Sequence, residues 1–297
     1  MTITELKYIV ALAKEQHFGR AAQSVFVSQP TLSIGIKKLE EELGVRIFER
    51  LSNKALPTQV GLRIIEAARD TLMSTDVIRA IAEEAKGDFI GDIAFGAIYT
   101  ICPYLLPKII PDLQRRNKHI RLFVEENYTA ELVNQLKDGN LDVVLLSLPI
   151  VESNLFKVKP IFAEEFFVIM PKGHHLEKYD RISPEQLEKE RLFLLGSGNC
   201  FRDQVLQTCP NCLSGEKGSQ ANQLIQGGSL STIQMMVAGG LGISVFPKMA
   251  VSEHANISVR PFTEPVPKRQ IALAWRKSFT HGNVIQTIED SLLACRA

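Results

Sequence analysis

Three of the five cysteines in this chain of 297 residues lie close together in the sequence, at Cys200, Cys209 and Cys212. Cys200 follows a Gly-Ser-Gly-Asn segment and opens a stretch with a helical pattern. Amide dipoles at such a helix start, together with the neighbouring Arg202, favour a thiolate over a thiol. A thiolate reacts with peroxide to form a sulfenic acid, which a second cysteine converts into a disulfide. The spacing therefore indicates redox chemistry centred on Cys200.

The separation of Cys200 and Cys209 has a structural consequence. If residues 200–209 form a helix, the two residues lie about 13 Å apart along its axis, because each residue adds about 1.5 Å. A disulfide requires Cα atoms within about 7 Å of one another. A bond between Cys200 and Cys209 therefore requires the helix to unwind, and oxidation would capture a refolded state.

Other interpretations of the three cysteines stay open. In the simplest, Cys200 is an ordinary buried cysteine. In a second, Cys200, Cys209 and Cys212 bind zinc, since residues 209–212 have the CxxC spacing, but no fourth ligand lies nearby in the sequence. A thioredoxin-like centre would need a βαβ pattern before the CxxC segment. We expect neither a metal nor a cofactor.

The elements that position Cys200 alternate between strands and helices from about Gly91 onward. The expected strands cover residues 93–97, 122–125, 141–146, 166–170, 192–195, 243–246 and 271–275. The expected helices lie near residues 103–115, 130–138, 230–238 and 283–295. This order predicts an α/β fold with largely parallel sheets, in which ligands bind beyond the carboxyl ends of strands. Thr100 and Thr129 lie at such strand–helix junctions, where each hydroxyl either holds a small polar molecule or ends a turn.

The first 57 residues contain short helical patterns, of which the third has the clearest limits. Ser28 offers a capping hydroxyl, and Pro30 suits the first turn of this helix. Gly44 suits the left-handed residue beyond its end, so the helix runs from about Gln29 to Leu43. Its predicted buried stripe consists of Leu32, Ile36, Leu39 and Leu43. Its opposite face presents Pro30, Thr31, Ser33, Ile34, Lys37 and Lys38.

This outer face is typical of a DNA-recognition helix, whose N-terminal side chains enter the major groove. The residues expected to contact base edges are Gln29, Thr31 and Ser33. Those expected to contact phosphates are Lys37 and Lys38. Residues 45–57 alternate and turn like a small wing, which would bring Arg50 and Lys54 to the sugar-phosphate backbone. The alternative is a solvated helix with one exposed isoleucine.

One uninterrupted helical pattern follows the wing. Thr58 caps it, and it continues to Lys86 and Gly87, a span of roughly 40 Å. Its apolar residues form more than one stripe, at positions 62, 64, 65, 68, 72, 78 and 82. A helix of this length without a covering domain predicts pairing with a second copy of the chain, and a two-fold dimer binds repeated DNA half-sites.

Composition and charge exclude several classes of protein. The chain has 45% hydrophobic and 23% charged residues, which is typical of soluble globular proteins. Its 34 Lys and Arg against 33 Asp and Glu exclude a histone-like cationic binder, although the basic surplus lies in residues 1–64. The polar, acidic start is unlike a secretory signal, and no apolar run reaches the ~18 residues of a membrane span. We therefore expect a cytoplasmic protein with no membrane partner.

The segments FGRAA (18–22), VSQPTLS (27–33) and LEEELGVRIFER (39–50) resemble the winged helix-turn-helix of LysR-type transcriptional regulators. The resemblance implies a winged helix-turn-helix DNA-binding domain at residues 1–58, a linker and dimerisation helix at 59–87, and a redox-sensing effector domain at 88–297. It further implies two Rossmann-like subdomains similar to periplasmic binding proteins, subdomain I at 88–162 and 268–297 and subdomain II at 163–267. It also implies a tetramer built from two dimers.

The segment GNCFRDQ (198–204) with Cys209, TICPYLLP (100–107) and Thr129 resembles the OxyR group of peroxide-sensing LysR-type regulators. This implies that Cys200 is the peroxidatic cysteine and Cys209 its resolving partner. The residues that it implies for positioning peroxide or water are Thr100, Thr129, Arg202 and Asp203. Asn199 departs from the group, which usually has histidine there. Cys212 is additional and could replace Cys209 as the resolving residue or pair with it.

Three hypotheses about function follow. The first is a regulator, not an enzyme, that binds double-stranded promoter DNA and is activated by hydrogen peroxide through a Cys200–Cys209 disulfide to control an oxidative-stress response. It forms a homodimer within a dimer-of-dimers tetramer, with RNA polymerase as a further partner. The alternative is a LysR-type regulator that responds to a small metabolite in the effector cleft. The third is a standalone thiol peroxidase.

Overall fold

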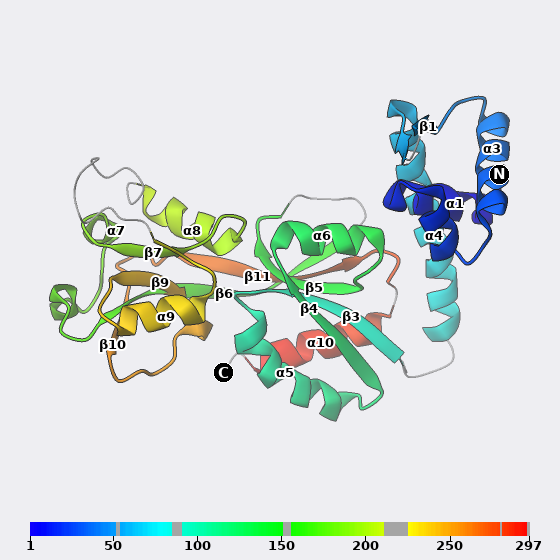
Figure 1. Cartoon of the computed structure of the whole chain (residues 1–297). Coiled ribbons are helices and arrows are strands. Elements are labelled where there is room, and N and C mark those ends of the chain that lie inside the picture. The colour runs from blue at the N-terminus through cyan, green and yellow to red at the C-terminus, as the bar shows by residue number, and fades with distance from the viewer. Residues whose placement is uncertain (52–53, 85–90, 151–155, 211–224, 280, 296–297) are drawn as a thin grey trace. The chain divides into compact units, whose positions relative to one another are not determined.

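The computed structural model describes residues 1–51, 54–84, 91–150, 156–210, 225–279 and 281–295 (Figure 1). The chain divides into two compact units, each described by itself. Unit 1 contains residues 1–87 and 278–280, and unit 2 contains residues 88–277 and 281–297. Among the described residues, no helix combines the length and the apolar character that crossing a membrane requires.

Unit 1 begins with three short helices: α1 (Ile3–Glu15), α2 (Phe18–Ser24) and α3 (Gln29–Leu43). The start of α3 is capped by Ser28, whose Oγ accepts a hydrogen bond from the Thr31 amide at 3.3 Å. The helix ends at Gly44, which has a left-handed φ of +69°. Both predicted limits of the third helix are confirmed.

The buried face of α3 packs into the apolar core of unit 1. Leu32, Ile36 and Leu39 are buried as predicted. Leu43 is 39% exposed, so the prediction that it completes the stripe is wrong. The core takes only the first three residues from α3, and the last turn leads out of it to the Gly44 turn.

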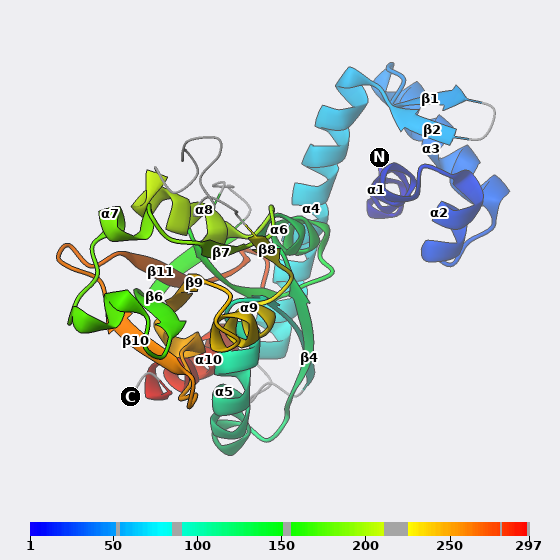
Figure 2. The ribbon, with the colours of Figure 1, turned by 60° about the vertical axis from the view of Figure 1, so that its left-hand side comes forward.

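A hairpin and a long helix complete unit 1. β1 (Phe48–Leu51) pairs antiparallel with β2 (Lys54–Pro57), as predicted for the wing (Figure 2). The Thr58 hydroxyl donates to the Arg46 carbonyl at 2.8 Å and accepts from the Gly61 amide at 2.9 Å. It thereby caps α4 (Gln59–Glu84), the predicted long helix.

In the part of the chain that the structure describes, unit 2 is built on one sheet of nine strands. The strands are β3 (Gly91–Ile98), β4 (Ile120–Asn127), β5 (Val143–Leu148), β6 (Phe156–Pro171), β7 (Leu192–Leu195), β8 (Ile225–Gly227), β9 (Ile243–Pro247), β10 (Ile257–Pro261) and β11 (Lys268–Arg276). The helices are α5 (Cys102–Arg116), α6 (Thr129–Asp138), α7 (Pro184–Leu187), α8 (Cys200–Thr208), α9 (Leu230–Ala238) and α10 (Gly282–Ala294). The 3-10 turn η1 (His175–Lys178) follows strand β6, and the 3-10 turn η4 (Lys248–Ala250) follows strand β9.

The strand order is β4-β3-β5-β11-β6-β9-β7-β8, with β10 also paired to β6. Parallel pairs lie at the two ends, where β3 joins β4 and β5, and β7 joins β8 and β9. The pairs made by β6 and β11 in the middle are all antiparallel. The α/β class is therefore as predicted, but the expectation of largely parallel sheets holds only at the ends, because β6 and β11 run between the two halves of unit 2 (Figure 1).

Helices cover both halves of the sheet. In the first half, α5 and α10 lie side by side (Figures 1 and 2). In the second half, α9 packs on β6, β7 and β9, and the apolar cluster there includes Phe201 and Val205 from α8. Helix α8 is therefore anchored to the core of the second half by one apolar face.

Candidate functional site

The loop between β7 and α8 places Cys200 at the start of a helix. All four residues of β7 are buried, which fixes the beginning of the loop. Gly198 has a φ of +92°, a left-handed conformation that favours glycine. Asn199 is buried, and its side-chain amide donates to the Gly196 carbonyl at 3.2 Å. Cys200 is the first residue of α8, as predicted, next to backbone N–H groups that favour negative charge.

Helix α8 separates Cys200 from Cys209. Cys200 is a half-buried free thiol, whereas Cys209 follows the last helical residue and is buried in the apolar cluster. The helix includes all nine residues from Cys200 to Thr208. At about 1.5 Å per residue, the two cysteines are about 13 Å apart along the axis. A direct bond between them therefore requires α8 to unwind.

The oxidation states of the cysteines differ in this structure. Cys102, Cys200 and Cys295 are free thiols. Cys209 is disulfide-bonded, and none of these three is its partner. Cys212 lies outside the described residues. The predicted Cys200–Cys209 disulfide is thus not the state that this structure describes.

The other two free cysteines are poor nucleophiles. Burial and the neighbouring Glu126 raise the pKa of the Cys102 thiol to about 12. Burial also raises the pKa of Cys295, with a contribution from Asp112. Both residues therefore stay protonated near pH 7, where only a thiolate is an efficient nucleophile.

Three polar atoms on or near the Cys200 loop are buried without a hydrogen-bond partner among the described residues: Thr129 Oγ1, Arg202 Nε and Gln204 Oε1. Thr129 begins α6, next to Tyr128, whose ring is 3.8 Å from where a Cβ on Gly198 would lie. Buried polar atoms normally have partners, so each of these atoms is available to a water or a small polar ligand. Thr129 and Arg202 were both predicted from the sequence.

The two charged residues predicted beside Cys200 differ in their exposure to solvent. The Arg202 side chain is largely buried, whereas the Asp203 side chain is 64% exposed. Their charged groups are 4.0 Å apart, which makes a weak surface ion pair. Arg202 thus lies inside the site region, and Asp203 faces solvent at its edge.

Thr100 belongs to a buried polar network that no local pattern in the sequence indicates. Its hydroxyl oxygen accepts a hydrogen bond from Arg269 Nη1 at 2.7 Å, and its carbonyl accepts one from Nη2 at 3.1 Å. Arg269 Nε donates to Glu164 at 2.7 Å, and the other oxygen of Glu164 accepts from the Met249 amide. The Arg269 guanidinium carbon is also 5.2 Å from the centre of the Phe201 ring. Phe201 is the residue that follows Cys200 in the sequence.

This network joins distant parts of unit 2. Glu164 comes from β6, Arg269 from β11, and Phe201 from α8. The signal in the sequence is a pair of opposite charges, Glu164 and Arg269, near residues 162 and 267, where the chain was expected to cross between subdomains. A charge in such a position is buried only when it is paired.

Gln204 fixes α8 to the first half of the sheet. Its side-chain nitrogen donates to Ser147 Oγ at 2.9 Å and to the Leu148 carbonyl at 3.0 Å. Both acceptors lie at the end of β5. Gln204 belongs to the motif at 198–204, but nothing local in the sequence indicates its role, because its partner lies 57 residues away.

The predicted DNA-contacting residues lie on α3 and the wing. Gln29, Pro30, Thr31 and Lys37 are exposed on α3, whereas Ser33 is half-buried. Lys37 Nζ is 3.5 Å from Glu41, an exposed pair that costs little to break. On the wing, Lys54 is exposed, and Arg50 lies opposite Ala55 in the hairpin.

The family comparisons cover both units. Residues 3–62 match the bacterial regulatory helix-turn-helix protein model of the lysR family, and residues 86–294 match the LysR substrate binding domain. The hydrogen peroxide-inducible genes activator of Dickeya chrysanthemi is 38% identical over 295 residues, which cover 98% of this chain and 95% of that protein.

Two solved OxyR structures match this chain over all or nearly all of its length. A full-length OxyR variant from Pseudomonas aeruginosa is 45% identical and has a TM-score of 0.81, with 100% of this chain and 96% of that chain covered. An H2O2-bound OxyR variant from Corynebacterium glutamicum is 27% identical and has a TM-score of 0.65, with 99% and 92% covered.

Proposed function

Because this chain belongs to the LysR family of bacterial helix-turn-helix regulators, and within it to the OxyR group, we propose that hydrogen peroxide activates it through Cys200. It is a DNA-binding transcription regulator and not an enzyme. The observation that carries the proposal is a free, half-buried thiol at the first position of α8, on the same helix as Arg202, whose buried Nε has no hydrogen-bond partner among the described residues. The proposed output is an oxidative-stress response.

The first chemical step is oxidation of Cys200. The Cys200 thiolate attacks one oxygen of hydrogen peroxide, the O–O bond breaks, and the products are a sulfenic acid and hydroxide, which takes up a proton to form water. The thiolate loses two electrons and the peroxide gains them. Thr129 and Arg202 are suited to holding the peroxide, because each has a buried polar atom with no hydrogen-bond partner in the part of the chain that the structure describes. Thr100 contributes to the positioning of the peroxide through its hydrogen bond with Arg269. Asp203 contributes to it through its negative charge at the edge of the site.

The second step is resolution by Cys209. Its thiolate attacks the Cys200 sulfenic sulfur, a disulfide forms, and the hydroxyl leaves as water after it takes up a proton. This step needs Cys209 as a thiol, so any disulfide at Cys209 must first be reduced. It also needs α8 to unwind, because the helical separation is far beyond the limit for a disulfide.

Unwinding α8 would release every contact that the helix makes. Phe201 and Val205 would leave the apolar cluster, and Gln204 would leave Ser147 and Leu148. The disulfide captures this refolded state and shifts the population of the effector domain toward it. We propose that the change reaches the DNA-binding domain through the assembly of subunits.

The proposed assembly is a homodimer through α4, with two dimers in a tetramer. Helix α4 exposes large apolar side chains at Val60, Leu62 and Ile78. Exposed apolar surface of this kind favours pairing with a second copy. The proposed partners of the assembly are double-stranded promoter DNA and RNA polymerase.

The proposed DNA interface is the exposed face of α3 with the wing. Gln29, Thr31 and Ser33 contact base edges, and Pro30 starts the helix at the groove. Lys37, Arg50 and Lys54 contact phosphates. Lys37→Ala should weaken binding to all sequences and lower the salt slope by about 1, whereas Gln29→Ala should relax preference at particular bases. An unchanged salt slope for both Lys37→Ala and Arg50→Ala would refute the phosphate contacts, and Lys118→Ala is the matched control.

A second candidate is regulation by a small metabolite, which one cavity favours. A hollow of about 520 Å³ in unit 2 is lined by Phe166, Gln204, Gln207, Lys268, Arg269 and Gln270. Its size suits a small polar ligand. A metabolite that binds there would regulate the protein without oxidation of Cys200.

Peptide mass spectrometry after a stoichiometric peroxide pulse separates the two candidates. The full-length protein is first reduced, so that all five cysteines start as thiols. We expect a disulfide between Cys200 and Cys209 in the wild type and in Cys295→Ser. Unmodified Cys200 after the pulse would defeat the peroxide proposal, and a Cys200–Cys212 bond would reassign the resolving residue.

A further inference from the structure

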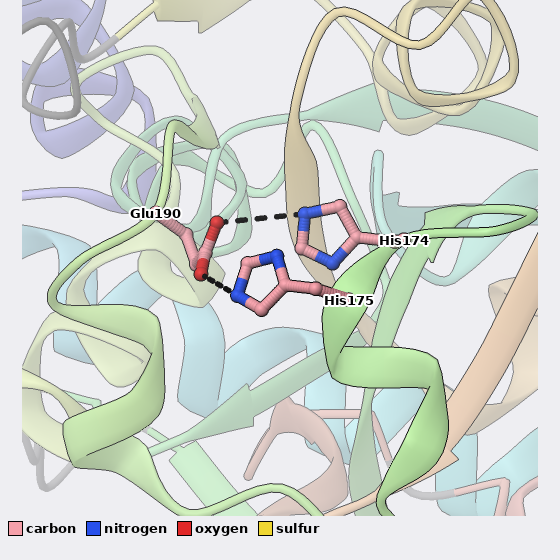
Figure 3. A group of neighbouring side chains, drawn as sticks. All are labelled: His174, His175 and Glu190. Atoms are coloured by element: carbon pink, nitrogen blue, oxygen red, sulfur yellow. Dashed lines mark ion pairs between the residues drawn. The ribbon is translucent and has the colours of Figure 1, made fainter.

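Outside the Cys200 site, one cluster of side chains has the composition of a metal site. His174 and His175 follow β6, and Glu190 lies between α7 and β7. Figure 3 shows both imidazole rings turned toward the Glu190 carboxylate. His174 Nε2 is 3.4 Å from one carboxylate oxygen, and His175 Nε2 is 2.9 Å from the other.

The spacing of these atoms fits a single ion. Two imidazole nitrogens and one carboxylate oxygen are ligands that zinc and similar divalent transition metals accept. Bonds of about 2.1 Å in a tetrahedron place ligand atoms about 3.4 Å from each other. The His174–Glu190 distance already has this value, and one potential ligand atom from each residue lies within 4.8 Å of the others.

Two side chains of the cluster are largely buried, and the third is exposed to solvent. The side chains of Glu190 and His174 are only 12% and 18% exposed. Glu190 is held at its backbone by a 3.0 Å hydrogen bond from its amide to the Leu187 carbonyl. The His175 side chain is 62% exposed, which leaves room for water as a further ligand.

Among the described residues, the ion pairs of Glu190 are both with histidine and none is with lysine or arginine. A largely buried carboxylate gains from a fixed positive charge. A divalent ion would supply that charge and would use the lone pairs of both rings.

We propose that His174, His175 and Glu190 bind one Zn²⁺ ion or a similar divalent transition metal ion, with water completing the coordination. The ion would tie the segment after β6 to the segment that enters β7. Binding has one identifiable cost. His174 Nδ1 accepts a long hydrogen bond from the Leu176 amide at 3.3 Å, and ligation through Nε2 moves the ring proton to Nδ1 and breaks it.

The test is zinc binding by the metal-free full-length protein, measured by equilibrium dialysis, with Co²⁺ absorption to identify the ligands. We expect one Zn²⁺ per chain and a Co²⁺ spectrum without thiolate charge-transfer bands. His175→Ala and Glu190→Gln should each weaken zinc binding at least tenfold. His119→Ala, an exposed histidine outside the cluster, should leave it unchanged.

His175→Ala decides the outcome if Glu190→Gln fails to fold, because the His175 side chain is mostly exposed. Thermal unfolding gives a second measurement, since Zn²⁺ should raise the Tm of the wild type and not that of His175→Ala. No zinc binding by the wild type, unchanged affinity of His175→Ala, or a thiolate band with Co²⁺ would each overturn the proposal. A thiolate band would assign the ion to the cysteines.

Discussion

Helices α3 and α8 carry the two proposed functions of this protein, and they are built in opposite ways. Helix α3 is capped at both ends by Ser28 and Gly44, and most of its proposed DNA-contacting residues lie on an exposed face. Helix α8 has Asn199 as its N-cap residue without a side-chain capping bond, and the two cysteines of the proposed switch lie at its two ends. A surface that recognises DNA benefits from a stable helix, whereas a switch of the proposed kind requires a helix that can unwind.

The largest expected effect is the loss of the oxidant response in Cys200→Ser. Serine cannot form a sulfenic acid, so peroxide should leave the DNA footprint of this variant unchanged. Its footprint before peroxide should equal that of the reduced wild type, because α3 does not depend on the thiol. A peroxide-dependent footprint in Cys200→Ser would place the switch on another cysteine, and Cys295→Ser is the matched control.

The next largest effect is expected on stability, from Arg269→Met. This change leaves Glu164 buried without its cation and should lower the free energy of unfolding by about 3–5 kcal/mol. Urea unfolding of the full-length protein measures it. The double variant Arg269→Met with Glu164→Gln should recover part of the loss, because no unpaired charge then remains. A loss below about 1 kcal/mol in the single variant would show that the network contributes little.

Removing the side-chain contacts of Gln204 should change the speed of the switch. Gln204→Leu eliminates two hydrogen bonds that hold α8 to the end of β5, worth about 1 kcal/mol together, so Cys200–Cys209 bond formation should become about fivefold faster. Quenched-flow thiol trapping measures the rate. Gln207→Leu is the control on the same helix, and equal rates in both variants would exclude a restraining role for Gln204.

The smallest effect is expected for the cap of α3. Ser28→Ala should cost about 1 kcal/mol at the start of this helix, whereas Ser28→Gly should cost a few tenths. Hydrogen exchange at the α3 amides measures the loss. The rate of Cys200 oxidation should be unchanged, and a change in that rate would contradict the separation between the two helices.

The limits of α3, the proposed DNA-recognition helix, could be predicted because the information that sets them is local. Capping residues at 28 and 44, an apolar stripe and a following hairpin are all contained in about thirty residues of sequence. The same holds for the start of α8 at Cys200 and for β7, whose limits match the prediction. The prediction that Leu43 is buried was wrong because periodicity alone does not indicate where the apolar core ends.

The rest of the site depends on contacts between distant residues. Arg269 meets Thr100 across 169 positions and Glu164 across 105, and Gln204 meets Ser147 across 57. No local pattern encodes these pairs. The first part of β6 and the strand β10 were not predicted, for a related reason. Charged residues interrupt the apolar–polar alternation of β6, and strands of this kind form because they pair with neighbouring strands.

The most direct test of the central claim is hydrogen exchange in α8, measured on the reduced full-length protein before and after a stoichiometric peroxide pulse. The helical amides of residues 204–208 should be protected before the pulse and lose most of that protection afterwards, because a Cys200–Cys209 bond cannot form across an intact helix. Protection that survives while the two cysteines are joined, or exchange that is unchanged with Cys200 unmodified, would contradict the account.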